Sequence, residues 1–333
     1  MPQPEKWTIR ELLTWTKDFF AKKGIESPRL EAEVLLGHAT GKSRVDLFVS
    51  YDEEPNEETR AAFRELVRRR VAGEPVAYLV GSKEFYSLDF HVDASVLIPR
   101  PETEQLVLET IEYFKKKGWQ AGFTGVKKRL PFQIGGELTD EPEPEPTPAP
   151  VPAPRVSGEL LICEVGVGSG CVSAALAKNI AAARIVALDV SPDALETARR
   201  NLERLGLDEQ VELLESDLFS VVPATLPEEQ RFDAIVSNPP YVSEPEYAAL
   251  EPTVRNYEPR VALVGGPTGA ELPIELVAQA ADRIKHGGRL SLELSPTTVE
   301  PVADALRADS RWTDVEIRKD FDGMNRFVVA IRV

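Results

Sequence analysis

The sequence predicts an α/β fold in which a mostly parallel seven-stranded sheet follows a small N-terminal helical domain. The first 75 residues carry apolar residues at helical spacing. From residue 159 onward, apolar strand-like segments alternate with helical ones, which is typical of a parallel sheet with helices on both faces. A glycine-rich turn directly follows the first of these strands, as in folds that bind a ligand at the carboxyl ends of their strands.

Residues 1–75 are expected to form a small helical bundle. The first helix begins at Thr8 with the spacing of a capping box, and the second begins at Ser27-Pro28, with Ser as the cap. The third runs from about Pro55 to Gly73. The residues expected to face inward are Ile9, Leu12, Leu13, Phe20, Leu30, Val34, Leu35, Phe63, Leu66, Val67 and Val71.

Residues 76–117 are expected to form a hairpin and a connecting helix. The segments VAYLVG, EFYSLDFHV and SVLIP carry β-type residues separated by turn breaks, and a helical segment follows from residue 99. Residues 118–157 include the proline-rich run EPEPEPTPAPVPAP, which favours polyproline II over a packed core. We expect a disordered or semi-rigid insert there, either a tolerated insertion or a partner-docking segment.

The α/β domain is expected to occupy residues 158–333. Ser191-Pro192 should cap the helix that follows the second strand. The last two strands are joined by a short connection, so a terminal hairpin would add an antiparallel strand. The seven expected strands are 160–165, 185–190, 211–214, 232–236, 289–294, 314–319 and 326–332.

The composition excludes several classes of protein. The formal net charge is −16, which disfavours a general nucleic-acid binder because phosphate contacts need clustered Lys and Arg. The two cysteines are not in a CxxC pair and the three histidines are scattered, so we expect no metal site and interpret both cysteines as small core residues. The sequence contains no apolar run of about 18 residues, and from residues 1–10 we expect neither a signal segment nor a transit peptide. We therefore expect a cytoplasmic protein with no membrane partner.

The glycine loop Gly166-Val167-Gly168-Ser169-Gly170 is a candidate cofactor site. It lies between a strand and a helix, where glycines allow close approach and the helix N-terminus favours an anion. The dinucleotide fingerprint would require glycine at position 171, which is Cys171. The loop therefore fits S-adenosylmethionine (SAM) better than NAD.

Two acids at strand ends extend this candidate site. Asp189 ends the second strand and could accept hydrogen bonds from both ribose hydroxyls of either cofactor. Asp217 lies at the end of the third strand, within SDLF, and could accept from an adenine amino group. A helix cap or a solvated loop would explain either acid alone. Three strand-end features in the right order make a ligand site the better interpretation.

The fourth strand ends in Asn238-Pro239-Pro240-Tyr241. Two prolines fix their φ angles and donate no backbone hydrogen bonds, so the turn is rigid and its carbonyl groups remain free to accept. An asparagine and a tyrosine beside such a turn could hold a small planar group.

Four blocks of sequence carry a resemblance to a known family. They are GEPVAYLVGSKEF at 73–85, VLIPRPETEQLV at 96–107, DVSPDALETARRN at 189–201, and SNPPY at 237–241 with EPR at 258–260. Together they resemble the HemK/PrmC family, the N5-glutamine methyltransferases of peptide chain release factors. The resemblance covers nearly the whole chain outside the insert and implies a Rossmann-like SAM-dependent methyltransferase domain, with the glutamine of a Gly-Gly-Gln loop as the methylated site.

The resemblance also implies residue roles. The loop at 166–170 would hold the methionine part of SAM, Asp189 the ribose, and Asp217 with Leu218 the adenine. Asn238 to Tyr241 would hold the substrate glutamine, and Asn238 would also border the cofactor. The Asn238 side-chain oxygen and the Pro239 carbonyl would each accept one amide hydrogen, and Tyr241 would pack against the amide plane. Catalysis would then depend on positioning and electrostatics rather than on a strong base.

The chain departs from the family pattern at several places, and three alternatives stay open. Glu164 stands where Asp is usual, and Val167 stands where Thr is usual. Gly265-Gly266-Pro267-Thr268-Gly269 replaces a usual Gly-Gly-x-Asp-Gly, and Glu293-Leu294-Ser295 replaces a usual Glu-Ile-Gly. Adenine-N6 methyltransferases of nucleic acid share NPPY, and a sister group methylates a ribosomal-protein glutamine, although Pro101-Glu102-Thr103-Glu104 favours the release-factor branch. A SAM-binding protein without catalysis is the third alternative.

Overall fold

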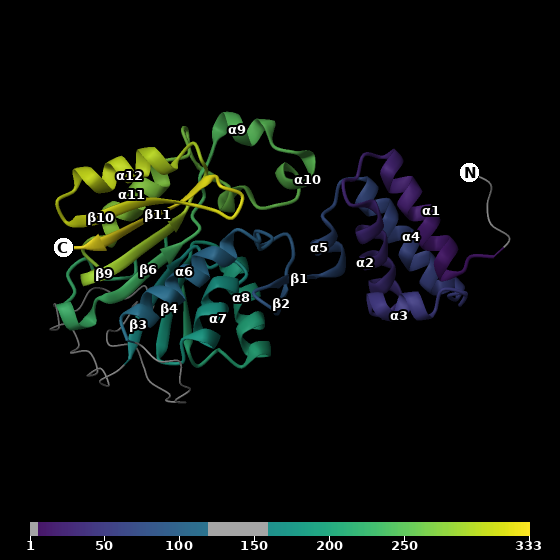
Figure 1. Cartoon of the computed structure of the whole chain (residues 1–333), viewed down its shortest axis with the longest axis horizontal. Helices are drawn as coiled ribbons and strands as arrows, with labels where there is room; N and C mark the ends of the chain where they lie inside the picture. The colour runs from purple at the N-terminus through teal and green to yellow at the C-terminus, as the bar shows by residue number, and fades with distance from the viewer. Residues whose placement is uncertain (1–5, 119–158) are drawn as a thin grey trace, which may run out of the picture. The chain divides into compact units, whose positions relative to one another are not determined.

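The computed structural model describes residues 6–118 and 159–333, which form two compact units (Figure 1). The helical unit comprises residues up to 82 together with 92–94 and 250–257. The sheet unit comprises the other described residues. The expected insert at 118–157 lies, apart from Gly118, outside the described residues.

Short helices around one apolar cluster make up the helical unit. Thr8 accepts the backbone N–H of Glu11 at 3.4 Å, so the expected cap of the first helix is present. The largest fully buried side chains of this cluster are Ile9, Phe20, Leu35, Leu36 and Leu47. The helices are α1 (Ile9–Lys22), α2 (Pro28–Thr40), α3 (Arg44–Val49), α4 (Glu57–Val71), α5 (Val76–Val80) and α10 (Pro252–Arg255).

Four expectations for this region are wrong. VAYLV is the short helix α5 rather than a strand, because Pro75 precedes its first turn and Gly81 ends it with φ 69°. Leu30 is 46% exposed, since Leu35 and Leu36 fill the inward face of α2 instead. Ser27 makes no side-chain cap, although Pro28 does occupy the first turn of the helix. The segment SVLIP is not a strand either, so the hairpin consists of β1 (Ser82–Phe85) and β2 (Leu88–His91) alone.

The sheet unit is built on the seven-stranded sheet that the sequence predicts, in the order β10-β11-β9-β6-β3-β4-β5. Neighbours from β9 to β5 run parallel, whereas β11 pairs antiparallel with both β9 and β10. The terminal hairpin therefore adds the expected antiparallel strand. The strands are β3 (Leu160–Val165), β4 (Ala183–Asp189), β5 (Val211–Glu215), β6 (Phe232–Ser237), β9 (Ile284–Glu293), β10 (Trp312–Lys319) and β11 (Asn325–Arg332).

Helices cover both faces of this sheet. Figure 1 shows α6 (Thr103–Lys116), α7 (Cys171–Asn179) and α8 (Pro192–Leu205) on one face and α11 (Glu271–Ala280) with α12 (Val299–Ala308) on the other. Ser191 caps α8 as expected, accepting the N–H of Ala194 at 3.2 Å. Both cysteines are buried, as expected of core residues. The shorter elements are η1 (Glu228–Gln230), β7 (Val242–Ser243), α9 (Glu244–Ala249), η2 (Arg260–Ala262) and β8 (Val264–Gly266).

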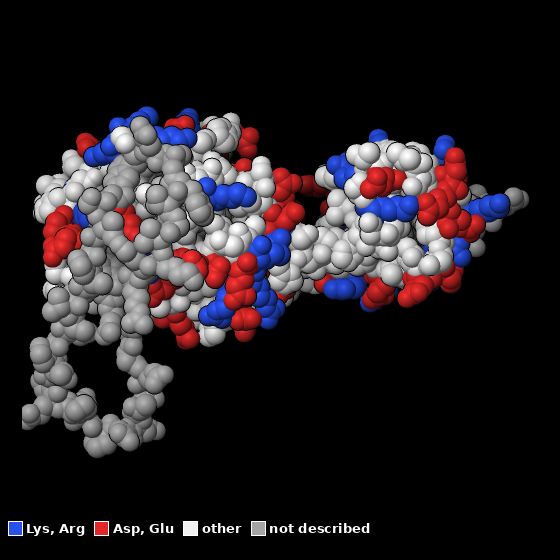
Figure 2. All heavy atoms as spheres, turned by 90° about the horizontal axis from the view of Figure 1, so that it is seen from below, with Lys and Arg blue, Asp and Glu red and all other residues white. Residues whose placement is uncertain are grey.

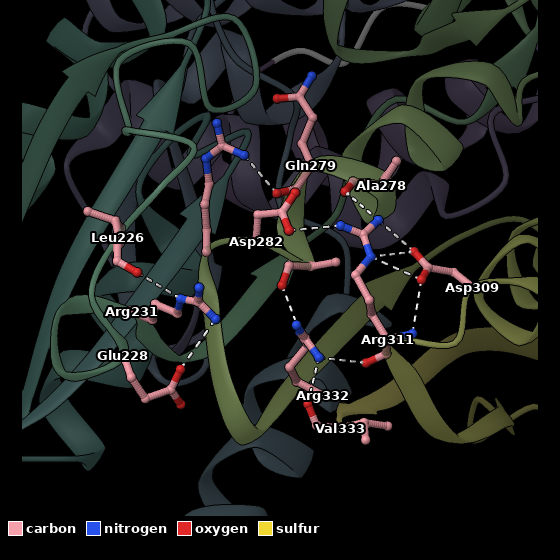
Figure 3. Close-up of polar contacts among 12 residues, drawn as sticks. Leu226, Glu228, Arg231, Ala278, Gln279, Asp282, Asp309, Arg311, Arg332 and Val333 are labelled. Carbon is pink, nitrogen blue, oxygen red and sulfur yellow. Dashed lines mark hydrogen bonds and ion pairs between the residues drawn. The ribbon is translucent and has the colours of Figure 1, made fainter.

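Arginine side chains donate hydrogen bonds to carbonyl groups at the C-terminal end of α11, at the edge of the sheet where β6 and β9 begin. Arg283 donates to the Gln279 carbonyl at 2.7 Å, and Arg332 donates to the Ala281 carbonyl at 2.7 Å. Figure 3 shows Arg311 beside Arg332, paired with Asp282 and Asp309. The last carbonyls of a helix lack partners within it, so these guanidinium groups satisfy and stabilise this end. The arginines at this edge serve the fold, and the candidate site lies at the opposite edge.

Candidate active site

The residues that the sequence singles out meet at one edge of the sheet. Strands β5, β4, β3 and β6 are consecutive neighbours and parallel, so their carboxyl ends lie together. Val165, the last residue of β3, is in register with Leu188 on β4 and with Ser237 on β6. The structure therefore places the glycine loop between Asp189 and Asn238, and the turn after β5 beside Asp189.

The glycine loop is held by backbone hydrogen bonds to β4. The N–H groups of Gly166 and Val167 both donate to the Leu188 carbonyl, at 2.8 and 3.0 Å. Gly168 has φ 52°, which a residue with a side chain rarely adopts, and the space where its Cβ would lie is open. Ser169 is buried within the loop. The result is a rigid backbone with open space at Gly168, which suits the close approach of a ligand.

Gly170 ends the loop directly before α7. Its φ is 81°, and a Cβ there would lie 3.3 Å from the Cβ of Ala198 on α8. A glycine here lets the loop and α8 pack closely, so α7 can begin beside the candidate site.

Asp189 connects the end of β4 to this loop. One carboxylate oxygen accepts the N–H of Gly168 at 2.9 Å, and the other accepts the N–H of Ser191 at 2.9 Å. Burial raises the pKa of Asp189, and these backbone hydrogen bonds oppose that shift. A carboxylate has about four lone-pair positions, so each oxygen keeps capacity to accept a hydroxyl.

The turn after β5 contains Asp217 and Leu218. Asp217 is exposed, whereas Leu218 is buried and has φ 47°. A positive φ is uncommon for a residue other than glycine, and such strain is often found at ligand sites. The turn is held by Ser216, whose N–H donates to the Asp189 carbonyl and whose hydroxyl donates to the Leu218 carbonyl.

Asn238 is fixed by a residue from a distant part of the chain. Its Nδ2 donates to the hydroxyl of Thr103, the first residue of α6, at 3.2 Å. Within residues 6–118 and 159–333, no group donates to the Asn238 Oδ1 atom or to the Pro239 carbonyl oxygen. Two adjacent acceptors are therefore unused.

The Pro-Pro turn rests against a second glycine-rich segment. Strand β7 pairs with β8, and the Val242 N–H donates to the Leu263 carbonyl at 2.8 Å. A Cβ at Gly265 would collide with the Pro240 carbonyl, and a Cβ at Gly269 would collide with the Tyr241 carbonyl. The departure at 265–269 therefore keeps glycine at the two positions where the turn approaches.

At the position where the family usually has Asp, Thr268 bonds to the helix that follows. Its hydroxyl donates to the Glu271 carboxylate at 2.8 Å, and its N–H donates to the same carboxylate. The substituted residue thus takes part in the local hydrogen bonding at the start of α11.

Glu293 and Tyr241 lie beside this turn in low-dielectric surroundings. Glu293 ends β9, is 1% exposed, and has a pKa that burial raises to about 7. Burial, with a smaller effect of Glu293, raises the pKa of Tyr241 to about 12. Tyr241 is therefore a neutral phenol at physiological pH, as its expected contact with a planar amide requires.

A further buried acid lies below the glycine loop. Glu164 precedes Val165 on β3 and accepts hydrogen bonds from the N–H of Ser173, at 2.9 Å, and from the Ser173 hydroxyl. Burial raises the pKa of Glu164 to about 8, and the hydrogen bonds from Ser173 oppose that shift. The carboxyl group is therefore largely protonated at pH 7.

Four residues of this site were not identified from the sequence as site residues. Thr103 and Glu293 contact or adjoin the Pro-Pro turn. Asn201 on α8 donates to the Ser169 carbonyl at 2.9 Å and so supports the glycine loop. Glu258 is buried, pairs with Arg100 and accepts the Ile98 N–H at 3.2 Å. The IPR and EPR blocks of the sequence therefore bind each other, a relation that only their shared family pattern could have suggested.

Comparison with known proteins finds one family for the N-terminal part of the chain and another for the later part. Residues 11–81 match the family described as PrmC N-terminal domain, and residues 162–259 match the family described as Methyltransferase domain. A release factor glutamine methyltransferase of Rhodopirellula baltica is 42% identical over 97% of this chain and 95% of its own length. Proteins of the same name from Geobacter sulfurreducens and Chlorobaculum tepidum are 38% and 36% identical, each over 98% of this chain and over 97% and 98% of their own lengths.

Proposed function

This chain belongs to the family of release factor glutamine methyltransferases, and from that premise we propose which of its residues carry out the reaction. The enzyme transfers a methyl group from SAM to the side-chain amide nitrogen of a glutamine in a peptide chain release factor. The proposed target is the glutamine of the Gly-Gly-Gln loop.

The edge of the sheet fits SAM. The glycine loop offers backbone with an open position at Gly168, and the proposal is that it holds the methionine part. Asp189 keeps lone pairs for the ribose hydroxyls while it orients the loop. Exposed Asp217 and strained Leu218 would hold the adenine. When bound there, SAM supplies a methyl group that its sulfonium already activates.

The observation that carries the proposal is the pair of unused acceptors at Asn238 Oδ1 and the Pro239 carbonyl. A primary amide has two N–H hydrogens, and a pair of adjacent acceptors can bind both. Binding both hydrogens fixes the plane of the NH₂ group and increases negative character on its nitrogen, which is otherwise a poor nucleophile. The acceptors are held in advance by Thr103 and by the rigid turn, so no reorganisation is needed during methyl transfer. Tyr241 would pack against the amide plane.

We assign substrate recognition to the helical unit, and we place the enzyme in the cytoplasm because its protein substrate acts in translation. No helix of the described residues is long and apolar enough to cross a membrane. On the face drawn in Figure 2, Lys and Arg are interspersed with Asp and Glu rather than gathered into one basic surface. That distribution supports a protein substrate over a nucleic acid, because a groove for nucleic acid needs clustered cations.

The test is mass spectrometry of a release factor after it has been incubated with this enzyme and SAM. The expected result is one methyl group on the glutamine of the release-factor Gly-Gly-Gln loop, and none on a release factor in which that glutamine is replaced by Glu. Double-stranded DNA and ribosomal proteins serve as competing substrates. Methylation of DNA adenine, or of a ribosomal-protein glutamine in preference to the release factor, would overturn the assignment.

A further inference from the structure

Glu293 lies beside Asn238 on the neighbouring strand. Leu292 of β9 is in register with Ser237 of β6, so the two residues that follow, Glu293 and Asn238, are adjacent at the same edge. The Glu293 side chain is almost fully buried, and its Oε2 atom has no hydrogen-bond partner among the described residues. Burying a carboxyl oxygen without a hydrogen-bond partner lowers the stability of the folded protein, so a functional explanation is needed.

Thr103 connects Glu293 to Asn238. The Thr103 side chain is 3% exposed, and its hydroxyl lies near enough to the Glu293 carboxyl group to favour the ionised form of that group. The same hydroxyl accepts from Asn238 Nδ2. A hydroxyl has a single hydrogen, so it cannot donate to both neighbours at once.

Because Thr103 has a single hydroxyl hydrogen, the interactions that connect Glu293 to Asn238 have a direction. An ionised carboxylate can only accept, so the Thr103 hydrogen must point to Glu293. The Thr103 oxygen then presents only lone pairs to Asn238, and the Asn238 amide must turn its Nδ2 toward Thr103. Its Oδ1 is thereby directed away from Thr103, and this is the orientation that the structure shows.

We propose that ionised Glu293 is a positioning residue that acts through Thr103 to hold the Asn238 amide with Oδ1 toward the substrate. This inference rests on the proposed role of Asn238 as an acceptor for the substrate amide. Protonated Glu293 can donate to Thr103, which can then donate to Asn238 Oδ1. The amide would in that case flip and present Nδ2, a donor, to the substrate NH₂ group, which offers only donors in the amide plane.

The charged groups around Glu293 come from several elements, and they oppose one another. Arg326 on β11 and Arg100 before α6 favour the ionised form, whereas Glu102 disfavours it. Arg326 is itself paired with Asp320 at 3.2 Å. The remaining titratable neighbours are the Tyr241 phenol and the Cys171 thiol at the start of α7, and Glu293 contributes to the raised pKa of each. Burial is the largest influence on Glu293 and holds its pKa near 7, so the proposed switch falls within the physiological range.

The experiment measures single-turnover methyl transfer to a release factor, at saturating SAM, from pH 6 to pH 8. For one ionisation near pH 7, the wild-type rate should rise about tenfold over this range. Glu293→Gln should be about tenfold slower than wild type at pH 8 and should not rise with pH. Thr103→Val should behave in the same way, and Thr103→Ser, which keeps the hydroxyl, should restore the wild-type profile.

Controls separate positioning from a general loss of structure. Glu109→Gln removes a partly buried carboxylate on α6, the helix that begins at Thr103. Glu109 pairs with Arg289 and Arg318, and its replacement should keep the wild-type pH profile. SAM affinity should stay within about twofold of wild type in Glu293→Gln and Thr103→Val. A pH profile that survives in Glu293→Gln overturns the inference, and so does a loss of SAM affinity that matches the loss of rate.

A second measurement does not depend on activity. The measurement is NMR of protein with asparagine-selective ¹⁵N labelling, and the Asn238 side-chain amide signal is assigned by its absence in Asn238→Ala. The chemical shift of this signal should titrate near pH 7 in wild type and should not titrate in Glu293→Gln. If the wild-type enzyme fails to methylate release factors, the proposed function fails, and this titration still tests the link between Glu293 and Asn238. A signal that does not titrate in wild type overturns the link itself.

Discussion

The Asp189 carboxylate accepts the backbone N–H of Gly168 at 2.9 Å, so the end of β4 is tied to the glycine loop that follows β3. The same carboxylate accepts the Ser191 N–H at the start of α8. One side chain therefore orients the loop while it keeps lone pairs for a ligand. Its loss should affect two parts of the proposed SAM site together.

We expect Asp189→Ala to weaken SAM binding by about 1–3 kcal/mol, the usual range for hydrogen bonds to a charged group. Isothermal titration calorimetry measures the change. Asp193→Ala is the matched control, because Asp193 is an exposed acid in the first turn of α8 and should leave affinity unchanged. Equal SAM affinity in Asp189→Ala and wild type would refute the ribose assignment.

Replacement of Asn238 should separate chemistry from cofactor binding. Asn238→Ala should slow methyl transfer by about 10²–10³-fold, by analogy with the loss of one preorganised polar contact to a transition state. Asn238→Asp keeps an acceptor but adds a charge that attracts the sulfonium, so it should bind SAM and still be slow. Single-turnover assays with a release factor, beside SAM titrations, measure both effects. Methyl transfer by Asn238→Ala at the parent rate would make Asn238 a purely structural residue.

Gly265 should be required for the position of the Pro-Pro turn. In Gly265→Ala the new Cβ would meet the Pro240 carbonyl, so the turn must move. A displacement of this kind should lower the methyl-transfer rate by roughly 10²-fold, since rates depend steeply on alignment. Thermal denaturation and SAM titration should show much smaller changes. Gly287→Ala is the control: Gly287 has φ 68° with open space around its Cβ position, so it tests backbone strain without a collision at the turn.

Glu164 should make the protein less stable as the pH rises. Its pKa is about 8 in the folded state and near its ordinary value of 4.5 in the unfolded chain, so folding favours the protonated form. Its contribution is complete below about pH 4.5 and is lost as the pH rises through about 8. Glu164→Gln mimics the protonated group and can still accept from Ser173. At pH 9 it should raise the free energy of unfolding by on the order of 5 kcal/mol, and at pH 5 by little.

Urea denaturation at several pH values measures this effect. Glu293 and Asp189 also have raised pKa values, so the wild-type slope should flatten only in part in Glu164→Gln. A variant whose stability falls with pH as steeply as wild type would show that Glu164 ionises normally in the folded protein.

Much of the sheet unit could be predicted because its signals are local. Most of its strands contain a short apolar run beside turn residues, and the glycine loop and NPPY each lie within a few consecutive residues. The secondary structure of VAYLV was harder to predict, since a five-residue apolar run suits a strand or a helix equally well. The signal that decides it, Pro75 before the segment and Gly81 after it, was present in the sequence.

The supporting residues of the site depend on contacts that no local pattern reports. Thr103 lies 135 residues from Asn238, and Asn201 lies 32 residues from Ser169. The sequence did contain a signal for Glu293. This carboxylate directly follows the buried run LSL at a strand end, which is the pattern that identified Asp189. The same rule applied to every strand would have found it.

The helical unit takes in residues 92–94 and 250–257 as well as the N-terminal helices, so the chain passes between the two units five times. In protein engineering, a fusion joined at one point would carry over only part of this unit. A chimera that gives the enzyme the helical unit of a relative must exchange three segments at once. One of them is α10, which begins shortly after the NPPY turn. Changes of specificity by recombination should therefore succeed only when the helices and the segment after the turn come from the same parent.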